Sequence, residues 1–192
     1  MNIQGKYTAI VIGTSAGGLN ALSFILEKLP ATYPVPVMVV QHRSKDQRYL
    51  LEEVLQSKCD IRIKQADEKE KIESGYVYVA PPDYHLLVEA DKTFSLSADQ
   101  PVCYSRPSID VLFETAATVF KDGLVGIILT GANNDGAAGT IAVKKNGGLT
   151  VVQDPGEAQF PFMPRAAIET NHVKYIRTLP EIQDFLLKIS DT

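Results

Sequence analysis

The chain has 192 residues, of which 45% are hydrophobic and 22% are charged, and its formal net charge is −4. This composition predicts one globular domain over residues 1–192, and the acidic balance argues against nucleic acid as a partner. No apolar run approaches the ~20 residues that a membrane span requires, and the N-terminus lacks the features of a secretory signal, so we expect a cytoplasmic protein without membrane insertion. The cysteines, Cys59 and Cys103, show no metal-binding spacing.

Strands and helices alternate through the first half of the sequence. Residues Thr8–Ile12 form a continuous apolar run, as expected of a strand buried on both faces, and Gly17–Leu29 carries apolar residues at helical spacing as far as Pro30. The same patterns predict a strand at Val35–Val40, a helix at Asp46–Ser57 and a strand at Ile61–Lys64. Three short strands follow, which we interpret as a β excursion with hairpin turns: Tyr76–Ala80, Leu86–Glu89 and Thr93–Leu96.

The second half continues this alternation. The predicted elements are a helix at Pro107–Phe120, a buried strand at Val125–Leu129, a helix at Gly136–Lys145, a strand at Thr150–Gln153, a short helix at Arg165–Thr170, a strand at Val173–Ile176 and a helix from the capping box at Thr178–Glu181 to about Ile189. Strands that alternate with helices predict an α/β fold with a mainly parallel sheet covered on both faces. Ligands of such sheets bind beyond the carboxyl ends of the strands.

Three of the predicted strand ends carry side chains with useful chemistry. Ser15 follows the first strand, His42 follows the second, and Asp135 follows the strand at Val125–Leu129. A serine hydroxyl needs a base, usually histidine, to act as a nucleophile near neutral pH, and an aspartate can orient that imidazole. The chain order of serine, histidine and aspartate differs from that of the α/β-hydrolases and argues against their fold.

Each of these residues also has a plainer interpretation. Residues Gly13–Gly17 fit the pattern G-x-S-x-G of a nucleophilic serine, but a glycine-rich loop before a helix can equally bind phosphate or serve only as a turn. His42 could simply close a strand end, and Asp135 could be a turn residue or the N-cap of the next helix. His85 is a weaker candidate for lining a site, and we expect His172 at the surface.

Six ordered blocks of the sequence match a family pattern. They are VIGTSAGGLNAL at Val11–Leu22, VVQH at Val39–His42, VYVAPPDYHLLV at Val77–Val88, RPSIDVLFETAA at Arg106–Ala117, LTGANNDGAAG at Leu129–Gly139 and MPRAAIE at Met163–Glu169. In these blocks the chain resembles the catalytic domain of the chemotaxis-type protein-glutamate methylesterases, the CheB family.

The resemblance implies a three-layer α/β/α domain that hydrolyses glutamyl methyl esters on methyl-accepting chemotaxis receptors, releases methanol and often deamidates receptor glutamines. The catalytic residues of the family fall on Ser15, His42 and Asp135, with no cofactor or metal. Backbone N–H groups near Ala16, His42 or Ala132 could form the oxyanion hole. The implied partners are the cytoplasmic helices of a receptor. Many members carry an N-terminal receiver domain, whereas the first catalytic strand here begins within the first dozen residues, so either a separate protein regulates the chain or the chain is a fragment.

The sequence departs from the usual family pattern at four places close to the expected site. Ala16 stands in place of threonine, Ala132 in place of methionine, Arg43 with Ser44 in place of Met-Pro, and Phe162 in place of glycine. These departures leave open a second function, a catalytically weak module that binds receptor or kinase helices through the same cleft. A third possibility is a nucleotide-binding domain that uses the Gly13–Gly18 loop.

Overall fold

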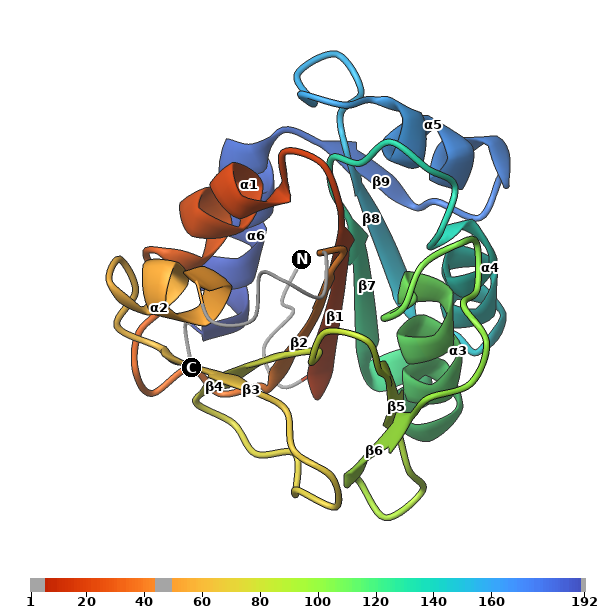
Figure 1. Cartoon of the computed structure of the whole chain (residues 1–192). Helices are drawn as coiled ribbons and strands as arrows, with labels where there is room; N and C mark the ends of the chain where they lie inside the picture. Colours follow the sequence, from red (N-terminus) through yellow and green to blue (C-terminus); the bar gives the residue numbers. More distant parts are fainter. Residues whose placement is uncertain (1–5, 44–49, 191–192) are drawn as a thin grey trace.

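Seven parallel strands form one sheet, in the order β3–β4–β2–β1–β7–β8–β9 (Figure 1). The structure, a computed structural model, describes residues 6–43 and 50–190. The strands of the sheet are β1 (Ala9–Thr14), β2 (Val37–Gln41), β3 (Arg62–Gln65), β4 (Tyr76–Val79), β7 (Leu124–Ile128), β8 (Leu149–Gln153) and β9 (Tyr175–Arg177). A separate antiparallel hairpin is formed by β5 (His85–Val88) and β6 (Phe94–Ser97).

Helices cover both faces of the sheet and complete a three-layer α/β/α fold. One layer contains α1 (Gly18–Leu26), α2 (Leu50–Gln56) and α6 (Leu179–Ser190), and the other contains α3 (Ile109–Phe120), α4 (Ala137–Lys145) and α5 (Phe162–Glu169) (Figure 1). A single 3-10 turn, Lys121–Gly123, leads from α3 into β7. In the described part of the chain, no helix combines the length and the apolar character that a membrane crossing would need.

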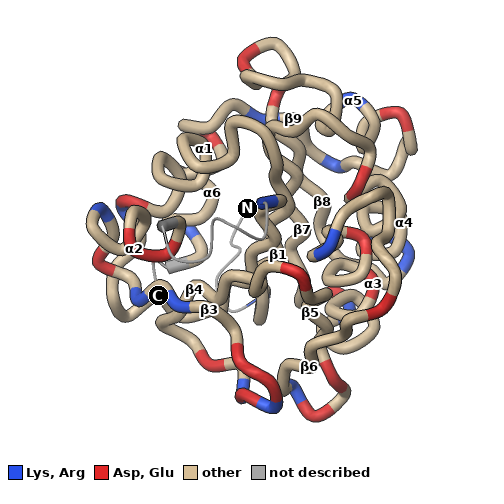
Figure 2. Tube along the Cα trace, viewed as in Figure 1, with Lys and Arg blue, Asp and Glu red and all other residues tan. Residues whose placement is uncertain are grey.

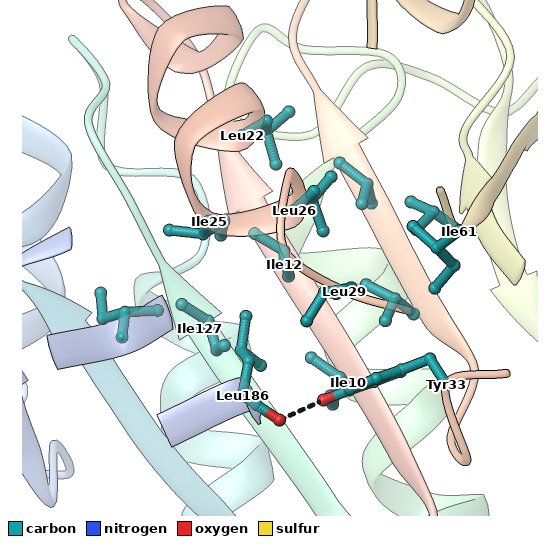
Figure 3. Close-up of a cluster of buried hydrophobic side chains, with 14 of the residues drawn as sticks. Ile10, Ile12, Leu22, Ile25, Leu26, Leu29, Tyr33, Ile61, Ile127 and Leu186 are labelled. Atoms are coloured by element: carbon teal, nitrogen blue, oxygen red, sulfur yellow. Dashed lines mark hydrogen bonds between the residues drawn. The ribbon is translucent and has the colours of Figure 1, made fainter. Parts of the chain in front are cut away.

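Alternate residues of the central strands pack into the two layers. Ile10 and Ile12 of β1 lie in the core beneath α1 and α6, where Figure 3 shows them among Leu22, Leu26 and Leu186. Ala9 and Val11 belong to the opposite core, together with residues of α3 and α4. This alternation explains why the β1 segment is apolar throughout, since a strand covered on both faces has no side that meets water.

The predicted fold class is confirmed, with one correction to the strands. Tyr76–Val79 belongs to the main sheet as β4, because it pairs in parallel with both β2 and β3, and only β5 and β6 form the excursion. Alternation alone does not tell a strand of a hairpin from a strand of the main sheet, and this explains the error.

Helix boundaries differ from the predictions by a few residues. The first helix ends at Leu26. Leu29 lies beyond the helix, and its N–H donates to the Leu26 carbonyl at 3.0 Å. The fifth begins at Phe162 because Pro164 lies in its first turn, where a missing N–H costs no helical hydrogen bond. Of the helix predicted at Asp46–Ser57, residues 46–49 lie outside the described ranges. The capping box is confirmed: Thr178 N donates to Glu181 Oε2 at 2.9 Å, and Glu181 N donates back to Thr178 Oγ1 at 3.4 Å.

Candidate active site

The sheet order brings the three predicted site residues to one edge. β1 lies between β2 and β7, so the loops that carry Ser15, His42 and Asp135 leave neighbouring strands at their carboxyl ends. Thr14 pairs with Gln41, and His42 N donates to Thr14 O at 3.0 Å. Ser15 and His42 are therefore the first residues beyond the same pair of strand ends.

Gln41 fixes the two loops relative to each other. Its Nε2 donates to Ser15 O at 2.8 Å and to His42 O at 2.9 Å. The space for this amide exists because residue 18 is glycine, since a Cβ there would overlap Gln41 Oε1. Gly17 adopts a φ of 79°, which lets the chain turn sharply from Ser15 into α1. On the other side, Ser15 N donates to Thr130 O at 3.0 Å and ties the loop to the end of β7.

A short contact joins His42 to a buried carboxylate. His42 Nε2 lies 2.7 Å from Asp135 Oδ2, and Asp135 is completely buried. The carboxylate also accepts hydrogen bonds from Ser108 Oγ at 2.8 Å, Ile109 N at 2.7 Å and Asp110 N at 3.0 Å, at the N-terminus of α3. Burial alone would raise the pKa of Asp135, but the donors from His42 and α3 outweigh it and hold that pKa below its ordinary value. Asp135 is thus an ionised group placed to hold an imidazole.

The alternative interpretation of Asp135 as the N-cap of the following helix is wrong. Gly136 occupies that cap position with a φ of 99° and without a side-chain bond. Instead, Asp110 of α3 accepts hydrogen bonds from Gly136 N at 2.9 Å and Gly139 N at 2.7 Å. Asp135, which precedes α4, therefore caps α3, and Asp110, which belongs to α3, caps α4. Burial and the nearby charge of Asp135 raise the pKa of Asp110 to about 6.

Asn133 settles which nitrogen of His42 carries the hydrogen. The Asn133 side-chain oxygen accepts from Asp135 N at 3.3 Å, so its Nδ2 faces His42 Nδ1 at 3.4 Å and Ser105 Oγ at 3.2 Å. An amide NH₂ only donates, so Nδ1 is the acceptor, and the ring hydrogen sits on Nε2, where it is donated to Asp135. The Ser105 hydroxyl also lies 3.5 Å from Nδ1. Nδ1 is consequently the nitrogen of His42 that can take up a proton.

Ser15 is half-buried at the base of this arrangement. Among the described residues, no hydrogen bond links the Ser15 hydroxyl to His42; such bonds are often loose in a free enzyme and tighten with substrate. Within the same part of the chain, the N–H groups of Ala16 and Ala132 have no hydrogen-bond partner, whereas that of His42 is engaged by Thr14 O. Ala16 and Ala132 therefore remain candidates for an oxyanion hole, and His42 N does not.

The other two histidines are separate from the candidate residues Ser15, His42 and Asp135. His85 is buried, with Nδ1 accepting from Ser108 N at 3.1 Å and Nε2 lying 3.1 Å from Gln100 O, so it supports the start of α3. His172 is partly exposed, and its Nδ1 lies 2.6 Å from Thr170 O. Arg43, one of the departures from the family pattern, forms a two-pronged ion pair with Glu52 at 2.9 and 2.7 Å and exposes only 3% of its side chain.

One cluster could be considered as a metal site. Ligand atoms of Cys103, Asp110 and Asp135 lie within 4.8 Å of one another. However, the Asp135 carboxylate already accepts four hydrogen bonds, and Asp110 accepts two from backbone N–H groups and one from the Cys103 thiol at 3.9 Å. Burial also raises the pKa of the Cys103 thiol, which disfavours the thiolate that metals require. These donors occupy the positions that a cation would need, so the cluster does not fit a metal ion.

Comparison with known proteins gives consistent matches along the chain. The sequence profile of the CheB methylesterase family matches residues 10–186. A relative from Leptospira interrogans is 53% identical over 187 residues, with 96% of this chain and 95% of the relative covered. The protein-glutamate methylesterase/protein-glutamine glutaminase of Clostridium acetobutylicum is 36% identical, and the match covers 94% of this chain but 52% of that protein. The crystal structure of the Thermotoga maritima CheB methylesterase catalytic domain superposes with a TM-score of 0.92 at 32% identity, covering 95% of this chain and 98% of that one.

Proposed function

The chain belongs to the CheB methylesterase family, and from that premise we propose that it hydrolyses glutamyl methyl esters, and deamidates glutamines, in a protein substrate. We propose that this substrate is the cytoplasmic part of a methyl-accepting chemotaxis receptor. The observation that supports this chemistry best is the 2.7 Å contact between His42 and the buried Asp135. The strands that precede these two residues lie on either side of the strand that precedes Ser15.

In the proposed mechanism Ser15 is the nucleophile and His42 the base. Ser15 Oγ attacks the ester carbonyl while His42 Nδ1 takes up the hydroxyl proton, because Nε2–H remains bonded to Asp135. The negative Asp135 stabilises the imidazolium that forms. His42 then returns the proton to the methoxy oxygen, so that methanol leaves and the glutamyl group stays on Ser15.

Water completes the cycle through the same groups. His42 Nδ1 takes a proton from the water that attacks the acyl-enzyme, and the Ser15 hydroxyl is regenerated as the glutamate side chain leaves. The N–H groups of Ala16 and Ala132, which have no hydrogen-bond partner among the described residues, can donate to the oxyanion of both tetrahedral intermediates. With a glutamine substrate the leaving group is ammonia, and the same residues act in the same order.

Methanol release from a methylated receptor fragment tests this function. We expect the wild-type protein to release methanol and Ser15→Ala to lose at least roughly a thousandfold in rate, as for loss of a covalent nucleophile. Ser57→Ala is the matched control, because Ser57 is an exposed serine at the end of α2. Methanol release by Ser15→Ala at the wild-type rate would overturn the assignment of the nucleophile.

A labelling experiment separates the enzyme from a module that only binds receptor or kinase helices. A fluorophosphonate should modify wild-type protein at Ser15 and leave Ser15→Ala unmodified. A wild-type protein that binds the receptor fragment but takes up no label would favour the binding module.

A further inference from the structure

The exposed apolar side chains gather around the candidate active site. The described residues include six large hydrophobic side chains with substantial exposure, and five of them lie in the loops and first helical turns at the carboxyl edge: Leu19, Tyr84, Tyr104, Phe160 and Phe162. The sixth, Ile176, lies on the edge strand β9. Exposed apolar residues scattered singly need no explanation, but a group of them around one site indicates a binding surface.

One flank of the site is formed by Phe160 and Phe162. Gly131 N donates to Phe160 O at 3.0 Å, and Phe160 N donates to Thr130 Oγ1 at 2.9 Å. Thr130 also holds the Ser15 backbone, so this segment is attached directly to the loop that carries the proposed nucleophile. Phe160, although its backbone is fixed in this way, is 39% exposed, and Phe162 is 58% exposed.

The opposite flank is formed by Tyr84 and Tyr104. Tyr104 is fully exposed at the tip of a turn closed by Val102 N to Ser105 O at 3.1 Å and Ser105 N to Val102 O at 2.8 Å. Both central residues have positive φ, 48° at Cys103 and 60° at Tyr104, a backbone conformation that normally selects glycine or asparagine. The next residue, Ser105, lies beside His42 Nδ1.

An arginine joins this turn to the loop of Tyr84. Arg106 donates to Asp83 Oδ1 at 3.0 Å from Nε and to the carbonyls of Ala98 and Asp99 at 2.7 and 2.9 Å. Arg106 therefore anchors the turn, while the Tyr104 side chain is left fully exposed by the residues that the structure describes. A large aromatic ring kept in water on a rigid support, next to the proposed base, is suited to contact a substrate.

The size of the glutamyl side chain requires contact between this surface and the substrate protein. The ester carbon lies only about 4 Å from its own Cα, three single bonds of about 1.5 Å away. When that carbon meets Ser15 Oγ, the substrate backbone must lie against the flanks. An apolar surface also favours a neutral ester or amide over the charged glutamate product, whose burial is costly.

We propose that Tyr84 and Tyr104 on one flank, and Phe160 and Phe162 on the other, form a docking surface for a substrate segment with apolar side chains on both sides of the glutamyl ester. This inference rests on the proposed function and adds the residues that select the substrate. It also gives a role to Phe162, which stands where the family usually has glycine.

The test compares a methylated receptor fragment with p-nitrophenyl acetate, which is too small to reach both flanks. Tyr104→Asn removes the ring and keeps a residue that tolerates positive φ, and Phe162→Ser removes the other ring. We expect each variant to lower the ratio of kcat/KM for the protein to kcat/KM for the small ester at least tenfold, mainly through KM for the protein. Ile176→Ser, on a strand separated from β1 by β7 and β8, should keep the wild-type ratio.

The outcomes separate this inference from the proposed function. Suppose that wild-type protein demethylates the fragment and both variants keep the wild-type ratio, whether kcat/KM is unchanged or falls equally for the two substrates. The docking surface is then wrong, and the methylesterase function stands. If wild-type protein hydrolyses p-nitrophenyl acetate but releases no methanol from methylated receptor fragments, the proposed function falls, and the docking surface for that substrate falls with it.

Discussion

The two helical layers hold to the sheet by different means. The layer of α1, α2 and α6 packs through an apolar core, with a buried hydrogen bond from Tyr33 Oη to Leu186 O at 2.9 Å as a polar link (Figure 3). The layer of α3 and α4 adds two buried carboxylates, Asp135 at the N-terminus of α3 and Asp110 at that of α4. Figure 2 shows that most other charged residues lie in outer loops and helices.

The two layers therefore contribute differently to the candidate site: one packs against it, and the other holds its carboxylate. The α1 layer follows the Ser15 turn directly, and among the described residues its helices bring no ionised group to His42. The α3 layer supplies the carboxylate and also the N–H donors that keep it ionised in a buried place. Changes in the two layers should therefore affect activity and stability to different extents.

The largest effect is expected from removing the charge at Asp135. In Asp135→Asn the amide nitrogen cannot accept the hydrogen bonds that reach the carboxylate, and His42 loses its orienting partner. We expect kcat to fall by about 10⁴, as for the same substitution in a Ser-His-Asp triad, with a loss of roughly 1–3 kcal/mol in the free energy of unfolding. Methanol release and thermal unfolding measure the two effects. Asp122→Asn, at an exposed aspartate, is the control, and an Asp135→Asn protein with wild-type kcat would show that the two layers do not differ in this way.

A smaller effect is expected at Asp110, on how the free energy of unfolding depends on pH. Its folded pKa of about 6 lies above the ordinary 3.8, so its contribution to stability is fully present below about pH 4 and is lost as the pH rises through 6. Between pH 5 and 7.5 this loss amounts to roughly 1–2 kcal/mol. Asp135 has a lowered pKa and acts in the opposite sense, losing its contribution only as the pH falls below the ordinary range.

Asp110→Asn should remove this loss, because the amide is neutral at every pH and its oxygen can still accept from Gly136 and Gly139. The free energy of unfolding, measured at a series of pH values, should fall between pH 5 and 7.5 for wild-type protein. For the variant it should change less over the same range. Parallel curves for the two proteins would contradict a raised pKa at Asp110.

The smallest effect is expected in the other layer. Tyr33→Phe removes one hydroxyl and leaves the Leu186 carbonyl without its partner in a buried place. We expect a loss of about 1 kcal/mol in the free energy of unfolding and no change in methanol release, since Tyr33 lies outside the candidate site. A tenfold fall in kcat would mean that this layer contributes to the chemistry after all.

The strands and the position of the site edge could be predicted because both depend on local patterns. Apolar runs such as Thr8–Ile12 identify buried strands, and the polar residues after them mark the edge of the sheet where the loops of Ser15, His42 and Asp135 lie. The place of Tyr76–Val79 in the main sheet was missed, since pairing partners distant in sequence decide it.

The supporting residues were harder to predict because their partners lie far away in the sequence. Ser108 could have been recognised as an N-cap before an apolar helix, and Gln41 as the polar end of an apolar strand. Nothing local indicates that Asn133 faces His42, that Ser105 approaches the same nitrogen, or that Asp110 accepts from the start of α4. These contacts arise only when β1, β2 and β7 come together.

The exchange of caps between α3 and α4 has a consequence for how the molecule opens. If the first turn of α3 frays, Asp135 loses donors while still buried; if the first turn of α4 frays, the same happens to Asp110. Neither turn can open cheaply alone, so the amides of Gly136, Gly139, Ile109 and Asp110 should exchange their hydrogens with solvent as one cooperative unit. The loop that carries Asp135 is thereby kept rigid by two helices at once, even though it lies at the surface edge of the sheet.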